Sequence, residues 1–158
     1  MELVEHACEL GKLLGNLQSL ELALRSFLYP NADPPHNPAP AGVSLLAPAV
    51  SETLPENAFT DWSSLGQLID RYNRIVKTVD PTLLIDRSVV DLRDMLAHGR
   101  LSAASPSPPL RLVKFDRPSR GKVRVTASEE LTLTWLTGNV TRVRSELAKV
   151  ERAMTSNA

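Results

Sequence analysis

The residues best suited to chemistry are Arg93 and His98, in the stretch RDMLAHG at positions 93–99. An arginine guanidinium stays cationic at physiological pH and forks onto phosphate oxygens. An imidazole titrates near neutrality and moves a proton in either direction. With no metal ligands expected nearby, the pair suits phosphate chemistry, such as cleavage of RNA without a cofactor.

The spacing of the pair limits how it can act. At about 100° per residue, five positions place His98 roughly 140° around a helix axis from Arg93 and about 7.5 Å along it. A continuous helix would therefore splay the two side chains. They can meet at one phosphate if the helix ends at His98, with Gly99 in the left-handed terminating conformation, or if a second copy of the chain supplies the other half. We expect both, and the carbonyls at the helix end then favour a protonated His98 as general acid.

A helix carrying this motif is expected to begin at Asp80. Asp80 is a good N-cap, and Pro81 fits the first helical turn. Apolar residues then recur at helical intervals up to the motif: Leu84, Ile85, Val89, Leu92 and Leu96. The sequence therefore places Arg93 and His98 in the last turns of one helix.

This helix resembles the motif helix of the HEPN superfamily. Ribonucleases of that superfamily carry an arginine, four to six residues and a histidine near a helix end, with a polar residue after the arginine. Arg93, Asp94 and His98 match the motif position by position. The resemblance implies a helical domain in which two protomers join their motif helices and cleave RNA through the 2′-OH without metal. It also implies a toxin or abortive-infection effector of bacterial phage defence, with an antitoxin protein as partner.

Two carboxylates are candidates for supporting the motif. Asp94 is expected to orient Arg93 or its counterpart across a dimer. Glu21 occupies a position in the apolar stripe of the first helix where an aliphatic residue was due. Either it pairs with Arg25 at i,i+4, or it orients Arg93 or His98 from a neighbouring helix.

Charge is unevenly distributed along the 158 residues. Formal net charge is zero, so the whole chain is no polycation. Between Arg100 and Arg124, however, the only acidic residue is Asp116. Such a segment can follow an RNA backbone, or it can be the solvated edge of a hairpin. The candidate RNA-contacting residues are Arg100, Arg111, Lys114 and Arg120.

Cys8 is the only cysteine, so neither an intramolecular disulfide nor a cysteine-based zinc site can form. We expect no metal and no cofactor. The first residues carry acids where a signal peptide needs bases, and no apolar run approaches membrane-spanning length. These features predict a cytoplasmic protein without membrane contact.

Apolar periodicity predicts three more helices. The first covers residues 3–28 and ends at Pro30, the second starts at Thr60–Asp61 and reaches Val76, and the last covers residues 133–154 with a strict heptad seam. Gly11 and Gly15 in the first helix indicate a close-packing face against another helix, in this chain or in a second subunit.

Two segments interrupt the helical pattern. Residues 31–60 form a proline-rich loop whose only apolar anchor is expected at residues 43–46. Residues 110–115 and 122–127 are β-like and flank a turn at 117–121, which predicts a hairpin insert over 110–127. The predicted fold is mainly α, a four-helix up-down HEPN-like bundle forming one domain over residues 1–158, with this hairpin before the last helix.

The leading hypothesis is a metal-independent endoribonuclease acting as a homodimer, in which Arg93 neutralises the phosphorane and His98 transfers a proton. In the structural alternative Arg93 forms a surface ion pair with Asp94 of a second copy of the chain or with Asp86 or Asp91 nearby, and His98 caps the helix. Two other functions follow from that alternative. One is a non-catalytic HEPN-like dimer that binds a nucleotide, RNA or protein. The other is a helical adaptor that docks another protein through its proline-rich segment or hairpin.

Overall fold

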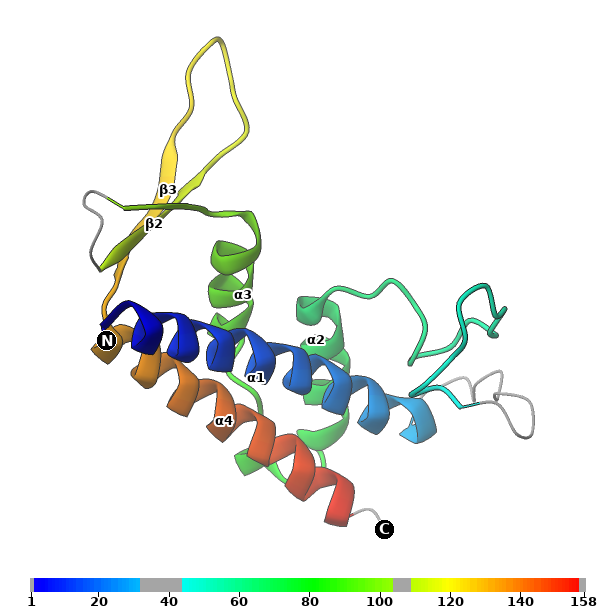
Figure 1. The fold of residues 1–158 in the computed structure, drawn as a ribbon. Coiled ribbons are helices and arrows are strands. Elements are labelled where there is room, and N and C mark those ends of the chain that lie inside the picture. The colour runs from blue at the N-terminus through cyan, green and yellow to red at the C-terminus, as the bar shows by residue number, and fades with distance from the viewer. Residues whose placement is uncertain (1, 32–43, 104–108, 157–158) are drawn as a thin grey trace. The chain divides into compact units, whose positions relative to one another are not determined.

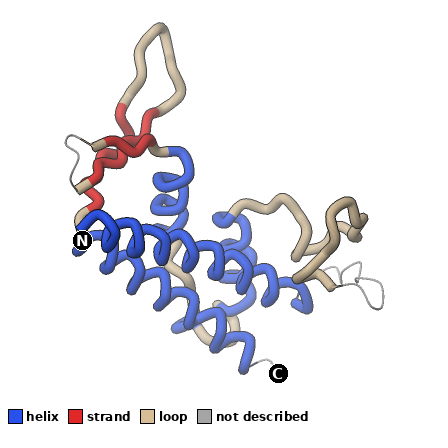
Figure 2. Tube along the Cα trace, in the orientation of Figure 1, coloured by secondary structure: helices blue, strands red, loops and turns tan. Residues whose placement is uncertain are grey.

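The computed structural model describes residues 2–31, 44–103 and 109–156. Eight elements follow one another (Figure 1): α1 (Glu2–Asn31), α2 (Leu65–Val76), the 3-10 helix η1 (Pro81–Leu83), α3 (Ser88–His98), β1 (Arg100–Ser102), β2 (Leu110–Phe115), β3 (Val125–Leu131) and α4 (Leu133–Ser156). The described chain is therefore mainly helical with one small antiparallel sheet, as Figure 2 shows by colour. This confirms the predicted class. The up-down HEPN-like arrangement stays a prediction.

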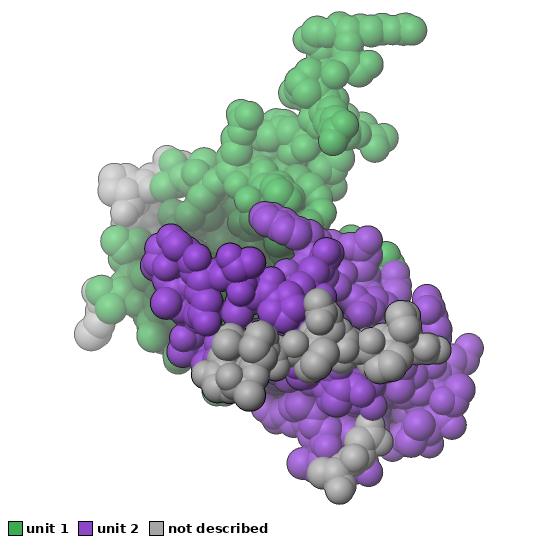
Figure 3. Space-filling model, turned by 90° about the vertical axis from the view of Figure 1, so that its right-hand side faces the viewer, with its two compact units in different colours: residues 1–18, 86–146 green, residues 19–85, 147–158 purple. Residues whose placement is uncertain are grey.

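Residues group into two compact units (Figure 3). One holds residues 1–18 and 86–146, and the other holds residues 19–85 and 147–158. Helices α1 and α4 each contribute residues to both units, so the division does not cut the chain into two consecutive domains. The motif, the sheet and the start of α4 all belong to the first unit.

The long helices α1 and α4 follow the predicted periodicity over most of their length. The apolar stripe expected in α1 is buried at Leu13, Leu17, Leu20, Leu24, Phe27 and Leu28, whereas Leu3, Ala7 and Leu14, expected on the same stripe, are exposed. In α4, four seam positions are buried: Leu136, Val140, Val143 and Val150. Pro30 does not end α1 as predicted, since the helix continues one residue further, to Asn31. The Asn31 side chain donates to the Phe27 carbonyl at 2.7 Å.

The second helix starts later than predicted. Its N-cap is Ser64, which forms a reciprocal capping box with Gln67, so α2 begins at Leu65 and not at residues 60–61. Trp62, which falls within the predicted helix but outside α2, is fully exposed. The anchor expected at residues 43–46 is also wrong in part, since Leu46 is exposed while Ala58 is buried; residues 32–43 lie outside the described residues.

Asp61, at the predicted start of the second helix, lies before α2 and binds two arginines. Its carboxylate lies 3.0 Å from Arg25 Nη1 and 2.9 Å from Arg71 Nη1, and it accepts the Ser63 N–H at 3.0 Å. Partial burial would raise the pKa of Asp61, but the hydrogen bonds from Ser63 and from the two guanidinium groups outweigh it and lower the pKa. This cluster connects α1, the loop before α2, and α2 within the second unit.

The helix predicted from Asp80 is broken into two. Asp80 does cap a helix, accepting the Thr82 N–H at 2.9 Å, but that helix is the short η1. Residues 84–86 then leave the helical conformation. Asn73 of α2 is the reason, because its side chain accepts the Ile85 N–H at 2.9 Å and donates to the Ile85 carbonyl at 3.0 Å. Both backbone groups of Ile85 are thus paired outside any helix, and α3 starts only at Ser88.

The sheet is larger than the predicted hairpin. Its strand order is β1-β2-β3, all antiparallel. Strand β2 matches the prediction, whereas β3 lies three residues beyond the predicted start and β1 was not predicted. The two-residue turn at Arg120 and Gly121, with φ of 50° and 72°, is of the kind that joins tightly paired strands.

Gly99 joins α3 directly to β1, and its conformation differs from the prediction. Its φ is −73° and its ψ is 157°, so it is extended and not left-handed. A glycine is required here because there is no room for a side chain. A Cβ at this position would lie 2.4 Å from the Met95 carbonyl oxygen and 2.8 Å from Leu112 Cδ1. Gly11 and Gly15 of α1, in contrast, have nothing from this chain within 4 Å of a Cβ, so no close partner within the described chain explains them.

Replacing Gly99 by alanine should lower the free energy of unfolding by about 1–3 kcal/mol, because a methyl group must displace backbone and the buried Leu112. The matched control is Gly138→Ala in α4, where the added Cβ meets open space; there we expect stabilisation of up to about 1 kcal/mol. Urea unfolding followed by far-UV circular dichroism measures both. Equal effects of the two substitutions would contradict the assigned crowding at Gly99.

Asp61→Asn should lower the free energy of unfolding by about 1.5–3 kcal/mol at neutral pH, since charged hydrogen bonds to two arginines are lost. Because the pKa of Asp61 is lowered by folding, its stabilisation is present above the unfolded-state pKa and disappears as the pH falls through the folded value. The difference between the two proteins should therefore shrink below about pH 4. A difference that stays constant in urea unfolding from pH 7 to pH 3 would refute this role.

Candidate functional site

The last turns of α3 carry the predicted motif. Val89, Leu92 and Met95 recur every three residues and are buried, which fixes one side of the helix against the rest of its unit, where α3 contacts β2. Arg93 and His98 consequently fall on the open side. The helix ends at His98, as predicted, and the imidazole of His98 is exposed to solvent.

Asp94 gathers the charged groups of the motif. Its Oδ1 lies 3.6 Å from Arg93 Nη1 and 3.9 Å from His98 Nε2, and its Oδ2 lies 3.4 Å from Lys114 Nζ of β2. Arg93 and His98, which a helical wheel places far apart, therefore both lie within 4 Å of Asp94 Oδ1. The His98 side chain is 63% exposed and that of Asp94 is 43% exposed. A solvent-borne phosphate can approach this group of four residues, here called the Asp94 cluster.

Glu21 has another partner. Its Oε1 accepts hydrogen bonds from Arg25 Nη2 at 3.1 Å and from Arg25 Nε at 3.3 Å, which confirms the i,i+4 pair weighed above. Arg25 in turn binds Asp61. The role of Glu21 in orienting Arg93 or His98 stays a prediction.

The four predicted RNA-contacting residues do not share one surface. Arg111 forms an ion pair with Glu130 on β3 and donates to Ser128 at 3.2 Å, so its charge is largely balanced. Successive residues of a strand face opposite sides, which puts Lys114 on the side of α3 and Arg111 on the other. Arg120 lies at the exposed hairpin tip. For Arg111 the structure therefore favours a place on the solvated edge of the hairpin over a contact with RNA.

Arg100 is placed differently from the other three. It is the first residue of β1, two positions after His98, and its guanidinium carbon lies 5.2 Å from the centre of the Phe115 ring. This is a cation–π contact, in which the ring face attracts the guanidinium. Arg100 therefore extends the charged surface from the end of α3 onto the sheet.

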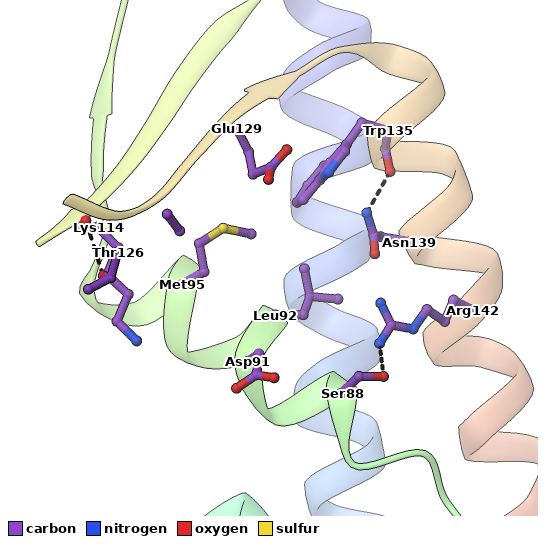
Figure 4. Close-up of a pocket in the computed structure, with 11 residues that line it drawn as sticks. Ser88, Asp91, Leu92, Met95, Lys114, Thr126, Glu129, Trp135, Asn139 and Arg142 are labelled. Atoms are coloured by element: carbon purple, nitrogen blue, oxygen red, sulfur yellow. Dashed lines mark hydrogen bonds between the residues drawn. The ribbon is translucent and has the colours of Figure 1, made fainter.

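A cavity of about 390 Å³ lies between α3, the sheet and the start of α4, and sequence reasoning missed it (Figure 4). Its walls include Leu92 and Met95 of α3, Glu129 of β3, and Trp135 and Arg142 of α4. Arg142 is held by hydrogen bonding to Ser88. No sequence signal could have found the cavity. Its walls form only when β3 pairs with β2 in the observed register, and the sequence places Trp135 merely beside the heptad seam.

The cavity and the Asp94 cluster are connected. Lys114 lines the cavity and also pairs with Asp94.

Within residues 2–31, 44–103 and 109–156, no group of three or more histidine, cysteine, aspartate or glutamate side chains is placed to hold a metal ion. None of the helices in the same described ranges combines the length and the hydropathy needed to cross a bilayer.

Asp94→Asn is expected to change the free energy of unfolding by less than about 1 kcal/mol, because its ion pairs are long and solvent-exposed. Thermal and urea unfolding of the variant and the parent protein provide the measurement, with Asp61→Asn as the reference for a carboxylate that stabilises the fold. A loss as large as that of Asp61→Asn would identify the Asp94 cluster as a structural ion-pair network.

Comparison of the chain with protein-family models, with curated proteins and with solved structures finds no match. The HEPN resemblance thus depends on Arg93, Asp94, His98 and the helical character of the chain. Membership of that superfamily stays a prediction, and function has to be argued from the geometry of the site itself.

Proposed function

We propose that this protein is a metal-independent endoribonuclease that cleaves RNA through the neighbouring 2′-OH. One observation carries the proposal: Arg93 and His98 reach the same oxygen of Asp94 on an open surface. A phosphate that takes the place of that carboxylate lies within reach of a permanent cation and of an imidazole. These are the two groups that phosphodiester transfer needs when no metal supplies the charge.

In the proposed reaction the 2′ oxygen attacks the adjacent phosphorus, and the bond from phosphorus to the 5′ oxygen breaks. The products are a 2′,3′-cyclic phosphate and a 5′-hydroxyl end. His98 accepts the 2′-OH proton or donates a proton to the 5′ oxygen, and Arg93 neutralises the charge of the phosphorane. Asp94 orients Arg93 before RNA binds.

The proposal includes a homodimer, in which the motif helix of a second copy brings its own arginine and histidine to the same phosphate. A toxin or abortive-infection effector held in check by an antitoxin protein is the biological setting that the HEPN resemblance implies. Both parts are open to test with the purified protein and with the neighbouring gene.

Arg93→Ala and His98→Ala should each reduce RNA cleavage by at least about 100-fold, while helical content and oligomeric state stay unchanged. Purified protein is incubated with total RNA in EDTA, and the ends are analysed for cyclic phosphate. The control is Arg144→Ala, which removes an exposed arginine of α4. Full cleavage by both motif variants would exclude these residues as the catalytic pair.

A second function is favoured by the 390 Å³ cavity beside Trp135: a non-catalytic module that binds a nucleotide, RNA or protein. An aromatic wall with a few converging polar groups is typical of ligand sites. The same EDTA experiment separates the two. RNA retained by the protein without cleavage products would favour the binding module.

A further inference from the structure

A second, smaller cavity lies at the base of the β2–β3 hairpin. Its volume is about 210 Å³, and six residues line it: His98, Arg100, Phe115, Asp116, Pro118 and Val123. All six belong to the same compact unit. His98 therefore belongs both to the Asp94 cluster and to the lining of this cavity, so an RNA strand whose phosphate lies at His98 has a cavity next to it.

The walls of the cavity suit a flat ring. Arg100 and Phe115 are already in cation–π contact, with the guanidinium carbon 5.2 Å from the ring centre. Pro118 and Val123 add apolar surface. Unpaired RNA bases are held in this way, by aromatic rings and by arginine planes. The volume is below the roughly 300–1,000 Å³ of sites for whole drug-sized ligands, so the cavity suits a smaller group.

Asp116 provides the acceptor that distinguishes one base from another. Its backbone N–H donates to the Arg124 carbonyl at 2.9 Å, which fixes its position across the hairpin. Its Oδ1 accepts the Arg117 N–H at 2.8 Å, and its Oδ2 lies 3.6 Å from the exposed Arg124 guanidinium. A carboxylate has about four acceptor positions, so further hydrogen bonds can be accepted.

Among the four RNA bases, guanine matches a carboxylate best. Its Watson–Crick edge has two adjacent donors, the ring N–H and the amino group, which one carboxylate accepts together. Uracil offers a single N–H between two carbonyl oxygens, and these repel a carboxylate. Adenine and cytosine offer one amino group beside an unprotonated ring nitrogen.

We infer that the hairpin cavity binds a guanine base of the RNA, stacked against Arg100 and Phe115 and hydrogen-bonded to Asp116, next to the phosphate held by Arg93 and His98. The inference rests on the proposed ribonuclease function for its choice of RNA. The inference predicts that the site prefers RNA in which a guanine lies next to the cleaved linkage.

Binding of guanosine 5′-monophosphate and uridine 5′-monophosphate to the full-length protein in EDTA tests the inference, because the two probes differ only in the base. NMR titration of the His98 ring and Arg100 side-chain signals gives both dissociation constants. We expect the guanosine nucleotide to bind about tenfold more tightly, as one bidentate base contact does elsewhere. Asp116→Asn, an isosteric change at a carboxylate that is 53% exposed, should reduce the preference to about twofold or less.

Control variants separate base binding from other effects. Glu151→Gln, an exposed carboxylate of α4, should leave both constants unchanged, and Phe115→Leu should weaken both nucleotides alike. The dispersion of the NMR spectrum of Asp116→Asn shows that the variant is folded. Equal binding of the two nucleotides, binding of neither, or a guanine preference that survives in Asp116→Asn would overturn the inference.

Arg93→Ala distinguishes this inference from the proposed function. This variant lacks the catalytic guanidinium but keeps the cavity, so its guanine preference should equal that of the parent protein. RNA cleavage that depends on Arg93 but shows no guanine preference would overturn the cavity assignment alone. A guanine preference in a protein that yields no cleavage products from RNA would overturn the ribonuclease proposal alone.

Discussion

The geometry of the motif depends on one steric constraint, the absence of room for a side chain at residue 99. The Met95 carbonyl and the buried Leu112 approach Gly99 so closely that a single carbon atom would overlap both. The end of α3 is thereby held directly against β2, and the chain enters β1 without a loop. His98 and Arg100 stand on either side of this residue. Their positions at the helix end and on the sheet both follow from it.

Two aspartates illustrate how burial separates structural from accessible charge. Asp61 and Asp94 each contact two or more cationic side chains. The Asp61 side chain is 19% exposed and is bound at about 3 Å, where water does not compete well. Asp94 is 43% exposed, and its distances are 3.4 Å or longer. In water such long contacts exchange easily, so the cations around Asp94 remain available to an incoming phosphate.

The sequence patterns predicted the parts of the fold that interactions between neighbouring residues determine. The stripes of α1 and α4, strand β2 and the end of α3 at His98 all follow from periodicity and from the glycine. The break at Ile85 did not, because it depends on the side chain of Asn73, twelve residues away. Strand β1 has only three residues and no alternating pattern, and the cavity beside Trp135 exists only once β3 has its register. Long-range contacts of this kind leave no signature in a short window.

The number of protons that the proposed cleavage transfers bears on whether it needs the proposed homodimer. During in-line transfer one proton leaves the 2′ oxygen and another must reach the 5′ oxygen, and a single imidazole cannot be base and acid in the same step. The chain has three histidines. His6 is buried, and His36 lies outside the described residues. If the two proton transfers are concerted, a second His98 is the simplest partner, because the two-fold axis of the proposed homodimer would bring an identical exposed helix end to the same phosphate. If they are sequential, one His98 suffices, and the requirement for a dimer then rests on the second arginine.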